Sequence, residues 1–157
     1  MRSRTPDADE YGEHIHLIER RILNIRHYGG TEVSAVACKI LLVDDESFIL
    51  NATASMLRSA GHEVHVCEQW ACVASTVRAH QPDLVLLDYN MPALTGDKIC
   101  QILKRNVMND QMRVVLYSAE PESDLIRITS ECGADGYIRK NVPAQELLEK
   151  ITRLAGE

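Results

Sequence analysis

The sequence predicts an α/β protein built on a doubly wound, three-layer α/β/α domain, with a five-stranded parallel sheet in the order 2-1-3-4-5. Two observations predict this fold. From Cys38 onward, short runs rich in Val, Ile and Leu alternate with amphipathic stretches of about 11 to 15 residues, which is typical of βα units. The runs Ile40 to Val43 and Leu84 to Leu87 are apolar throughout, which indicates central strands buried on both faces.

Five βα units can be assigned in order. We expect strands at Lys39 to Val43, Glu63 to Cys67, Leu84 to Leu87, Val114 to Tyr117 and Gly136 to Arg139. We expect helices at Ser47 to Ala60, Gln69 to His80, Gly96 to Asn106, Glu122 to Cys132 and Ala144 to Leu154. Gly61 suits the end of the first helix, where a positive φ is common, and Pro143 suits the first turn of the last.

Residues 1 to 37 differ in character from residues 38 to 157, which form the expected main domain. The first segment carries an apolar stripe at helical spacing, made by Ile15, Ile18, Ile22 and Ile25. We expect one extra N-terminal helix that ends at Gly29 and Gly30, followed by a linker from Thr31 to Ala37. This helix could dock on its own domain or mediate a homodimer, and the sequence leaves both open.

The composition excludes several classes of protein. A net charge of −6 argues against direct nucleic-acid binding, which usually needs clustered Lys and Arg. No run of about 18 apolar residues and no secretory leader are present, so we expect no membrane span and a soluble, cytoplasmic protein. The five cysteines lack zinc-site spacing, and we interpret them as reduced and mostly buried.

Three carboxylates stand at the ends of two expected strands. Asp44 and Asp45 close the first strand and Asp88 closes the third, and these strands are neighbours in the predicted order. Each aspartate alone could simply cap a helix. Together they would repel one another unless a cation compensates them, and oxygen ligands favour Mg²⁺ or Mn²⁺.

Two further polar residues follow strands at the same edge. Ser118 ends the fourth run and Lys140 ends the fifth. A hydroxyl and an ammonium are the partners that a carboxylate-bound phosphoryl group requires. The alternative for each alone is a helix cap for Ser118 and a solvated surface lysine for Lys140.

Four motifs resemble the receiver domain of bacterial two-component response regulators, in particular single-domain receivers of the chemotaxis type. They are Asp44-Asp45-Glu46, Asp88-Tyr89-Asn90-Met91-Pro92 with Gly96, Ser118-Ala119, and the run from Gly133 to Lys140. The resemblance covers about residues 38 to 155 and implies a flavodoxin-like fold. One departure is that Asn141 follows Lys140, where the family usually has a cis-linked proline.

The resemblance implies a role for each matching residue. Asp88 would accept a phosphoryl group from a sensor histidine kinase or phosphotransfer protein. Asp45 and Asp44, with Asp88 and the main-chain carbonyl of Asn90, would hold Mg²⁺. Lys140 would pair with the phosphoryl group, Ser118 would move toward it, and Tyr137 would follow Ser118. Asn90 and Glu120 would tune the lifetime of the aspartyl phosphate, with fast decay expected for this pair.

The expected output is a conformational change. It would be read by a protein partner through the fourth helix, fifth strand and fifth helix, since we expect no output domain after the last helix. The domain would act as a phosphoacceptor that catalyses only its own modification, not as an enzyme. Two alternatives stay open: a Mg²⁺-dependent phosphohydrolase, which would normally need a second carboxylate at the place of Asn90, and a degenerate receiver acting as a constitutive interaction module.

Overall fold

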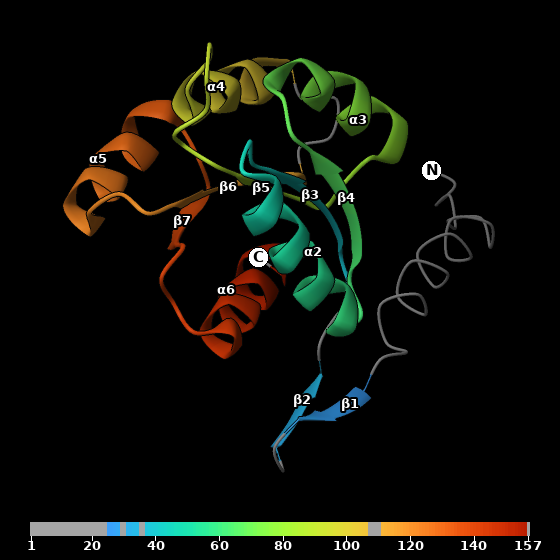
Figure 1. Cartoon of the computed structure of the whole chain (residues 1–157). Coiled ribbons are helices and arrows are strands. Elements are labelled where there is room, and N and C mark those ends of the chain that lie inside the picture. The colour runs from blue at the N-terminus through green and yellow to red at the C-terminus, as the bar shows by residue number, and fades with distance from the viewer. Residues whose placement is uncertain (1–24, 29–30, 35–36, 107–110, 157) are drawn as a thin grey trace, which may run out of the picture. The chain divides into compact units, whose positions relative to one another are not determined.

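The computed structural model describes residues 25–28, 31–34, 37–106 and 111–156. The chain divides into two units, Met1–Ala37 and Cys38–Glu157 (Figure 1). Within the described residues, no helix is long and apolar enough to cross a membrane.

The described part of the first unit is a β-hairpin. Strand β1 (Ile25–Tyr28) pairs antiparallel with β2 (Thr31–Ser34), with Ile25 opposite Ser34 and Tyr28 opposite Thr31. The expected linker from Thr31 and the helical assignment of Ile25 are therefore wrong. Two short runs separated by two glycines are typical of a β-hairpin. Ile25 therefore belongs to a strand, in which side chains repeat every two residues, and not to a helix, in which they repeat about every 3.6. Ile15, Ile18 and Ile22 of the expected helix lie outside the described residues.

The second unit contains the five-stranded parallel sheet that the sequence predicts. Its order is β4-β3-β5-β6-β7, which is 2-1-3-4-5 when the strands of this unit alone are counted. The strands are β3 (Lys39–Val43), β4 (Glu63–Cys67), β5 (Leu84–Leu87), β6 (Arg113–Ser118) and β7 (Gly136–Arg139). The central strands β3 and β5 are almost wholly buried because helices cover both faces of the sheet.

The helices lie in two layers. They are α2 (Ser47–Ser59), α3 (Val73–His80), α4 (Gly96–Asn106), α5 (Glu122–Cys132) and α6 (Ala144–Gly156), and a 3₁₀ turn, η1 (Trp70–Cys72), precedes α3. Helices α2 and α6 cover one face of the sheet, and α3, α4 and α5 cover the other (Figure 1). The predicted α/β/α fold is thus confirmed, with most boundaries within one or two residues.

Each layer has its own apolar core, because successive strand residues point to opposite faces. On the α2 and α6 side, Ile40 and Leu42 pack with Leu50, Leu57 and other buried residues. On the other side, residues of the same strands pack against α3, α4 and α5 in a cluster that includes Leu41, Val43, Ile99, Leu103 and Ile128. The two cores hold the strands in register, which fixes the positions of the residues at their carboxyl ends.

Asp135, directly before β7, ties α4 to β6. Its carboxylate accepts a hydrogen bond from the main-chain N–H of Val114 at 2.7 Å. The same carboxylate pairs with Lys104 of α4 and, at 3.4 Å, with Arg113 of β6. Loss of this carboxylate would leave a partly buried N–H and two cations without their partner, so Asp135 has a structural role.

Candidate functional site

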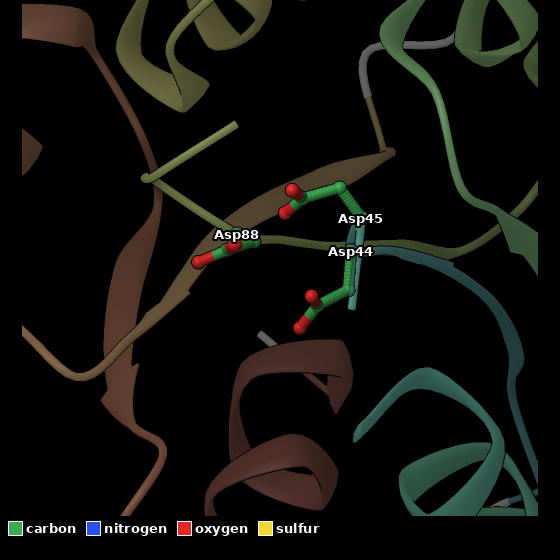
Figure 2. A group of neighbouring side chains, drawn as sticks. All are labelled: Asp44, Asp45 and Asp88. Carbon is green, nitrogen blue, oxygen red and sulfur yellow. The ribbon is translucent and has the colours of Figure 1, made fainter. Parts of the chain in front are cut away.

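The three predicted aspartates meet at the carboxyl edge of the sheet. Asp44 and Asp45 follow β3, Asp88 follows β5, and Figure 2 shows their side chains together at this edge. One carboxylate oxygen from each residue lies within 4.8 Å of the others, the only such group of three or more possible metal ligands among the described residues. The order of the strands brings them together, because β3 and β5 are hydrogen-bonded neighbours.

Main-chain hydrogen bonds hold the cluster in place. The N–H of Asp88 donates to the carbonyl of Val43 at 2.9 Å, which continues the pairing of β5 with β3 past the end of the strand. The N–H of Asp44 donates to the carbonyl of Cys67 at 3.1 Å. Asp44 and Asp88 are buried, with 0% and 2% exposed, and Asp45 is the most accessible of the three.

Lys140 reaches the cluster from the end of β7. Its Nζ lies 2.7 Å from Oδ2 of Asp44 and 3.2 Å from Oδ1 of Asp88. Both contacts are ion pairs, and the carboxylate of Asp44 is fully buried. The described residues contain no cis peptide bond. The bond between Lys140 and Asn141 is therefore trans, and Lys140 contacts both carboxylates with the bond in this form.

The cluster carries more negative charge than Lys140 compensates. The pKa of Asp88 is raised from 3.8 to about 6, because burial and the charge of Asp44 outweigh the opposite effects of Lys140 and the main-chain N–H of Asn90. Burial alone would lower the pKa of Lys140, but the carboxylates of Asp44 and Asp88 outweigh it and raise that pKa. The ionised site therefore favours an additional cation.

A close main-chain approach shapes the loop after β5. A Cβ at Gly96 would lie 2.4 Å from the carbonyl oxygen of Asp88 and 2.8 Å from Cα of Tyr89. The N–H of Gly96 donates to the carbonyl of Tyr89 at 2.9 Å. Only glycine allows α4 to begin this near to the Asp88 loop, because both neighbouring atoms belong to the main chain.

The two predicted switch residues, Ser118 and Tyr137, differ in their exposure to solvent. Ser118 is fully buried at the end of β6, and its hydroxyl oxygen accepts a hydrogen bond from the N–H of Glu120 at 3.2 Å. Tyr137 lies on β7 with its hydroxyl on the outside, where it donates to Oε1 of Glu122 at 2.9 Å. The structure thus holds Tyr137 outward through Glu122, a partner that the sequence did not indicate.

Asn90 and Glu120 form a bridge between two loops. Nδ2 of Asn90 donates to Oε1 of Glu120 at 2.7 Å, which joins the loop after β5 to the loop after β6. The sequence indicated both positions but not this contact, because they are thirty residues apart. Glu46, which belongs to the first motif but had no role assigned from the sequence, lies 4.0 Å from Lys140 at the rim of the cluster.

Fold and site together define a class of protein. The chain combines a doubly wound parallel sheet with a carboxylate cluster and a lysine at the carboxyl ends of its strands. Residues 40–152 match the model of the response regulator receiver domain, and the chain belongs to that family. The resemblance inferred from the motifs is confirmed, and the comparisons give no support to a phosphohydrolase or a degenerate module.

Similar proteins include two regulators of known name. The phosphate regulon transcriptional regulatory protein PhoB of Pseudomonas aeruginosa is 32% identical over 112 residues, which cover 71% of this chain and 49% of that protein. The DNA-binding response regulator MtrA of Mycobacterium tuberculosis is 29% identical, with 72% and 48% covered. The chain spans about half the length of these curated relatives.

Two solved structures share the fold. The CheY-like receiver domain protein of Methanospirillum hungatei superposes with a TM-score of 0.69 at 25% identity, covering 76% of this chain and 94% of that one. The BeF₃-activated N-terminal receiver domain of Klebsiella pneumoniae RstA gives 0.69 at 26% identity, with 76% and 99% covered. This chain is therefore a receiver domain of the two-component signalling type, preceded by an N-terminal segment.

Proposed function

We propose that Asp88 accepts a phosphoryl group from the phosphohistidine of a sensor kinase or phosphotransfer protein. The observation that carries this proposal is the position of Asp88 in the cluster, beside Lys140 and within reach of two further carboxylates. A carboxylate oxygen of Asp88 would attack phosphorus in line as the bond to the donor imidazole breaks. The carboxylate is a weak nucleophile, so the rate depends on alignment and on neutralisation of charge.

The residues of the cluster fit Mg²⁺. One carboxylate oxygen from each of the three aspartates lies within 4.8 Å of the others, and the single ammonium of Lys140 leaves part of their negative charge uncompensated. Asp44, Asp45 and Asp88, with the carbonyl of Asn90, would hold the ion, and Mn²⁺ suits the same oxygen ligands. When bound, the ion would neutralise charge on the phosphoryl oxygens.

Lys140 and Ser118 act on the product of the transfer. The ammonium of Lys140, now 3.2 Å from Asp88, would pair with a phosphoryl oxygen. The Ser118 hydroxyl ends the neighbouring strand β6, and it would turn from the N–H of Glu120 toward the new acceptor. Movement of Ser118 would draw the loop after β6 inward, and Tyr137 would then leave Glu122 and follow.

The surface formed by α5, β7 and α6 would transmit this change to a protein partner. A pocket of about 480 Å³ opens on that surface, and Tyr137, Ile126, Lys150 and Leu154 are among the residues that line it. Because Tyr137 is both a switch residue and part of the pocket wall, its movement would alter the surface that the partner contacts. PhoB is a transcriptional regulatory protein and MtrA is a DNA-binding response regulator. For this chain we propose a protein as the immediate target.

A phosphotransfer profile tests the proposed donor. Purified histidine kinases of the source organism, each labelled on its own histidine, are mixed with the wild-type chain and with the Asp88→Ala variant. We expect one kinase to transfer label rapidly to the wild type and none to label the variant. Equal labelling of the two proteins would refute Asp88 as the acceptor.

A further inference from the structure

Two cysteine residues lie near each other beside the acidic cluster. Cys67 is the last residue of β4 and is 2% exposed, and Cys72 ends the short turn η1 and is partly exposed. Cys72 packs against the core cluster that contains Cys67, and the hydroxyl of Thr76 contacts both the sulfur of Cys67 and the carbonyl of Cys72. The pair therefore combines a partly exposed thiol with a buried thiol beside it.

Polar contacts through Thr76 join the two cysteine residues. Sγ of Cys67 lies 3.3 Å from Oγ1 of Thr76, and that hydroxyl donates to the carbonyl of Cys72 at 2.7 Å. Because the Thr76 proton is used in this way, the thiol of Cys67 donates to Thr76. Sγ of Cys72 donates to the carbonyl of Gln69 at 3.0 Å, within the same turn. Only a short 3₁₀ turn must adjust to bring the sulfurs into bonding distance, and such turns are easily reshaped.

We propose that Cys67 and Cys72 form a redox-active dithiol that closes to an intramolecular disulfide on reaction with a peroxide. The sulfur of Cys72 attacks one peroxide oxygen, the O–O bond breaks, and Cys72 becomes a sulfenic acid as the first water leaves. The sulfur of Cys67 then attacks the sulfur of Cys72, the S–O bond breaks, and hydroxide leaves with the Cys67 proton as the second water. Two thiols are oxidised and one peroxide is reduced.

The disulfide would act on the neighbouring acidic cluster. The carbonyl of Cys67 accepts the hydrogen bond from the N–H of Asp44, and Cys67 pairs with Val43 in the sheet. Closing the disulfide pulls on the chain at Cys67 and thereby on the residue that holds the buried carboxylate. We expect slower phosphorylation of the oxidised protein, and this consequence rests on the function proposed for Asp88.

The chain contains a matched control pair. Cys100 and Cys132 are also neighbours, because Sγ of Cys100 donates to the main-chain carbonyl of Cys132 at 3.6 Å, but they are 0% and 4% exposed. A peroxide cannot reach either sulfur without opening of α4 from α5. Accessibility therefore distinguishes the two pairs, and only Cys67 with Cys72 should react in the folded protein.

Peptide mapping of the full chain tests the dithiol. The protein is treated with hydrogen peroxide, its remaining thiols are alkylated, and trypsin then releases residues 59–78, which hold both Cys67 and Cys72. We expect this peptide to lose about 2 Da and to carry no alkyl group. Cys100 and Cys132, which lie in separate tryptic peptides, should stay free of a disulfide. The Cys72→Ala variant should show no loss of 2 Da. An unchanged, fully alkylated 59–78 peptide in the wild type would overturn the proposal.

Phosphorylation of the oxidised protein tests the coupling. We expect labelling by acetyl phosphate to slow by about threefold or more, because a displacement of about 1 Å can cost on the order of 100-fold in rate. A reductant should restore the rate, and Cys72→Ala should be insensitive to peroxide. Equal rates for the reduced and disulfide forms would overturn the coupling. Absence of labelling in the reduced protein would instead refute the function proposed for Asp88, because the peptide mass reports the disulfide independently.

Discussion

Replacement of Asp88 by Asn should stabilise the metal-free domain at neutral pH. Asp88 is buried, and its pKa is raised to about 6 by burial first and then by Asp44, against the opposing effect of Lys140. Above that pH the folded protein must hold an ionised carboxylate where the neutral form is preferred. Asn has nearly the same shape as Asp and carries no charge, so the variant avoids this cost.

The size and sign of this stability change follow from the pKa of Asp88. An acid whose folded pKa lies above its unfolded value contributes stability that is complete below the unfolded pKa, 3.8, and is lost as the pH rises through about 6. At about 1.4 kcal/mol per pKa unit, the full loss is about 3 kcal/mol. Because Asp44 and Lys140 readjust in the variant, we expect a gain of about 1.5 to 3 kcal/mol for Asp88→Asn, or about 5 to 10 °C in Tm.

Thermal unfolding in a chelator measures this effect. The melting temperatures of wild type and Asp88→Asn should agree near about pH 4 and diverge as the pH approaches about 7.5. Mg²⁺ should narrow the gap, because it stabilises the wild type more than a variant that lacks one carboxylate. Asp97→Asn removes a negative charge outside the cluster and serves as the control. A variant that melts at or below the wild type at neutral pH without metal would refute this account of the site.

Three further outcomes are expected. Combined Asn90→Arg and Glu120→Leu substitutions should lengthen the half-life of the aspartyl phosphate by about tenfold. The larger and apolar side chains would replace the hydrogen-bonded pair and block the path of the water that attacks phosphorus. Unchanged decay in Mg²⁺ would contradict this. Asp135→Ala should lower the free energy of unfolding in urea by about 2 to 3 kcal/mol, because it leaves a main-chain N–H and two cations unpaired, and a loss below about 0.5 kcal/mol would show the network to be dispensable. Gly96→Ala should reduce both stability and labelling of Asp88, because its methyl group would overlap the main chain of the Asp88 loop; a variant equal to the wild type in both would show that the loop readjusts freely.

The sheet and the carboxylate cluster could be predicted because both depend on local patterns. Apolar runs such as Ile40 to Val43 report burial on both faces, and that fixes the central strands. Once the strand order is known, Asp44, Asp45 and Asp88 must lie at one edge, because the carboxyl ends of parallel strands meet there.

The N-terminal segment shows where a local pattern misleads. Ile25 continues the helical spacing of three earlier isoleucines, yet it begins a strand that pairs across Gly29 and Gly30. The two glycines suit either the end of a helix or the turn of a hairpin. The choice depends on pairing between the flanking runs, which apolar periodicity does not report.

Side-chain contacts between loops could not be predicted from the sequence. Two hydrogen bonds, Asn90 to Glu120 and Tyr137 to Glu122, depend on the rotamers of residues that are far apart in the sequence. The proximity of Cys67 and Cys72 has another cause. Zinc-site spacing does not report it, because a strand end followed by a 3₁₀ turn brings the two residues together beside Thr76.

The central claim is that Asp88 is the single phosphoacceptor, and intact-protein mass spectrometry tests it most directly. Wild type, Asp88→Asn and the control Asp97→Asn are incubated with acetyl phosphate and Mg²⁺, with a chelator in a parallel series. The account predicts one added phosphoryl group, about 80 Da, on wild type and Asp97→Asn, none on Asp88→Asn, and none in the chelator. A phosphorylated species that persists in the Asp88→Asn variant would contradict it.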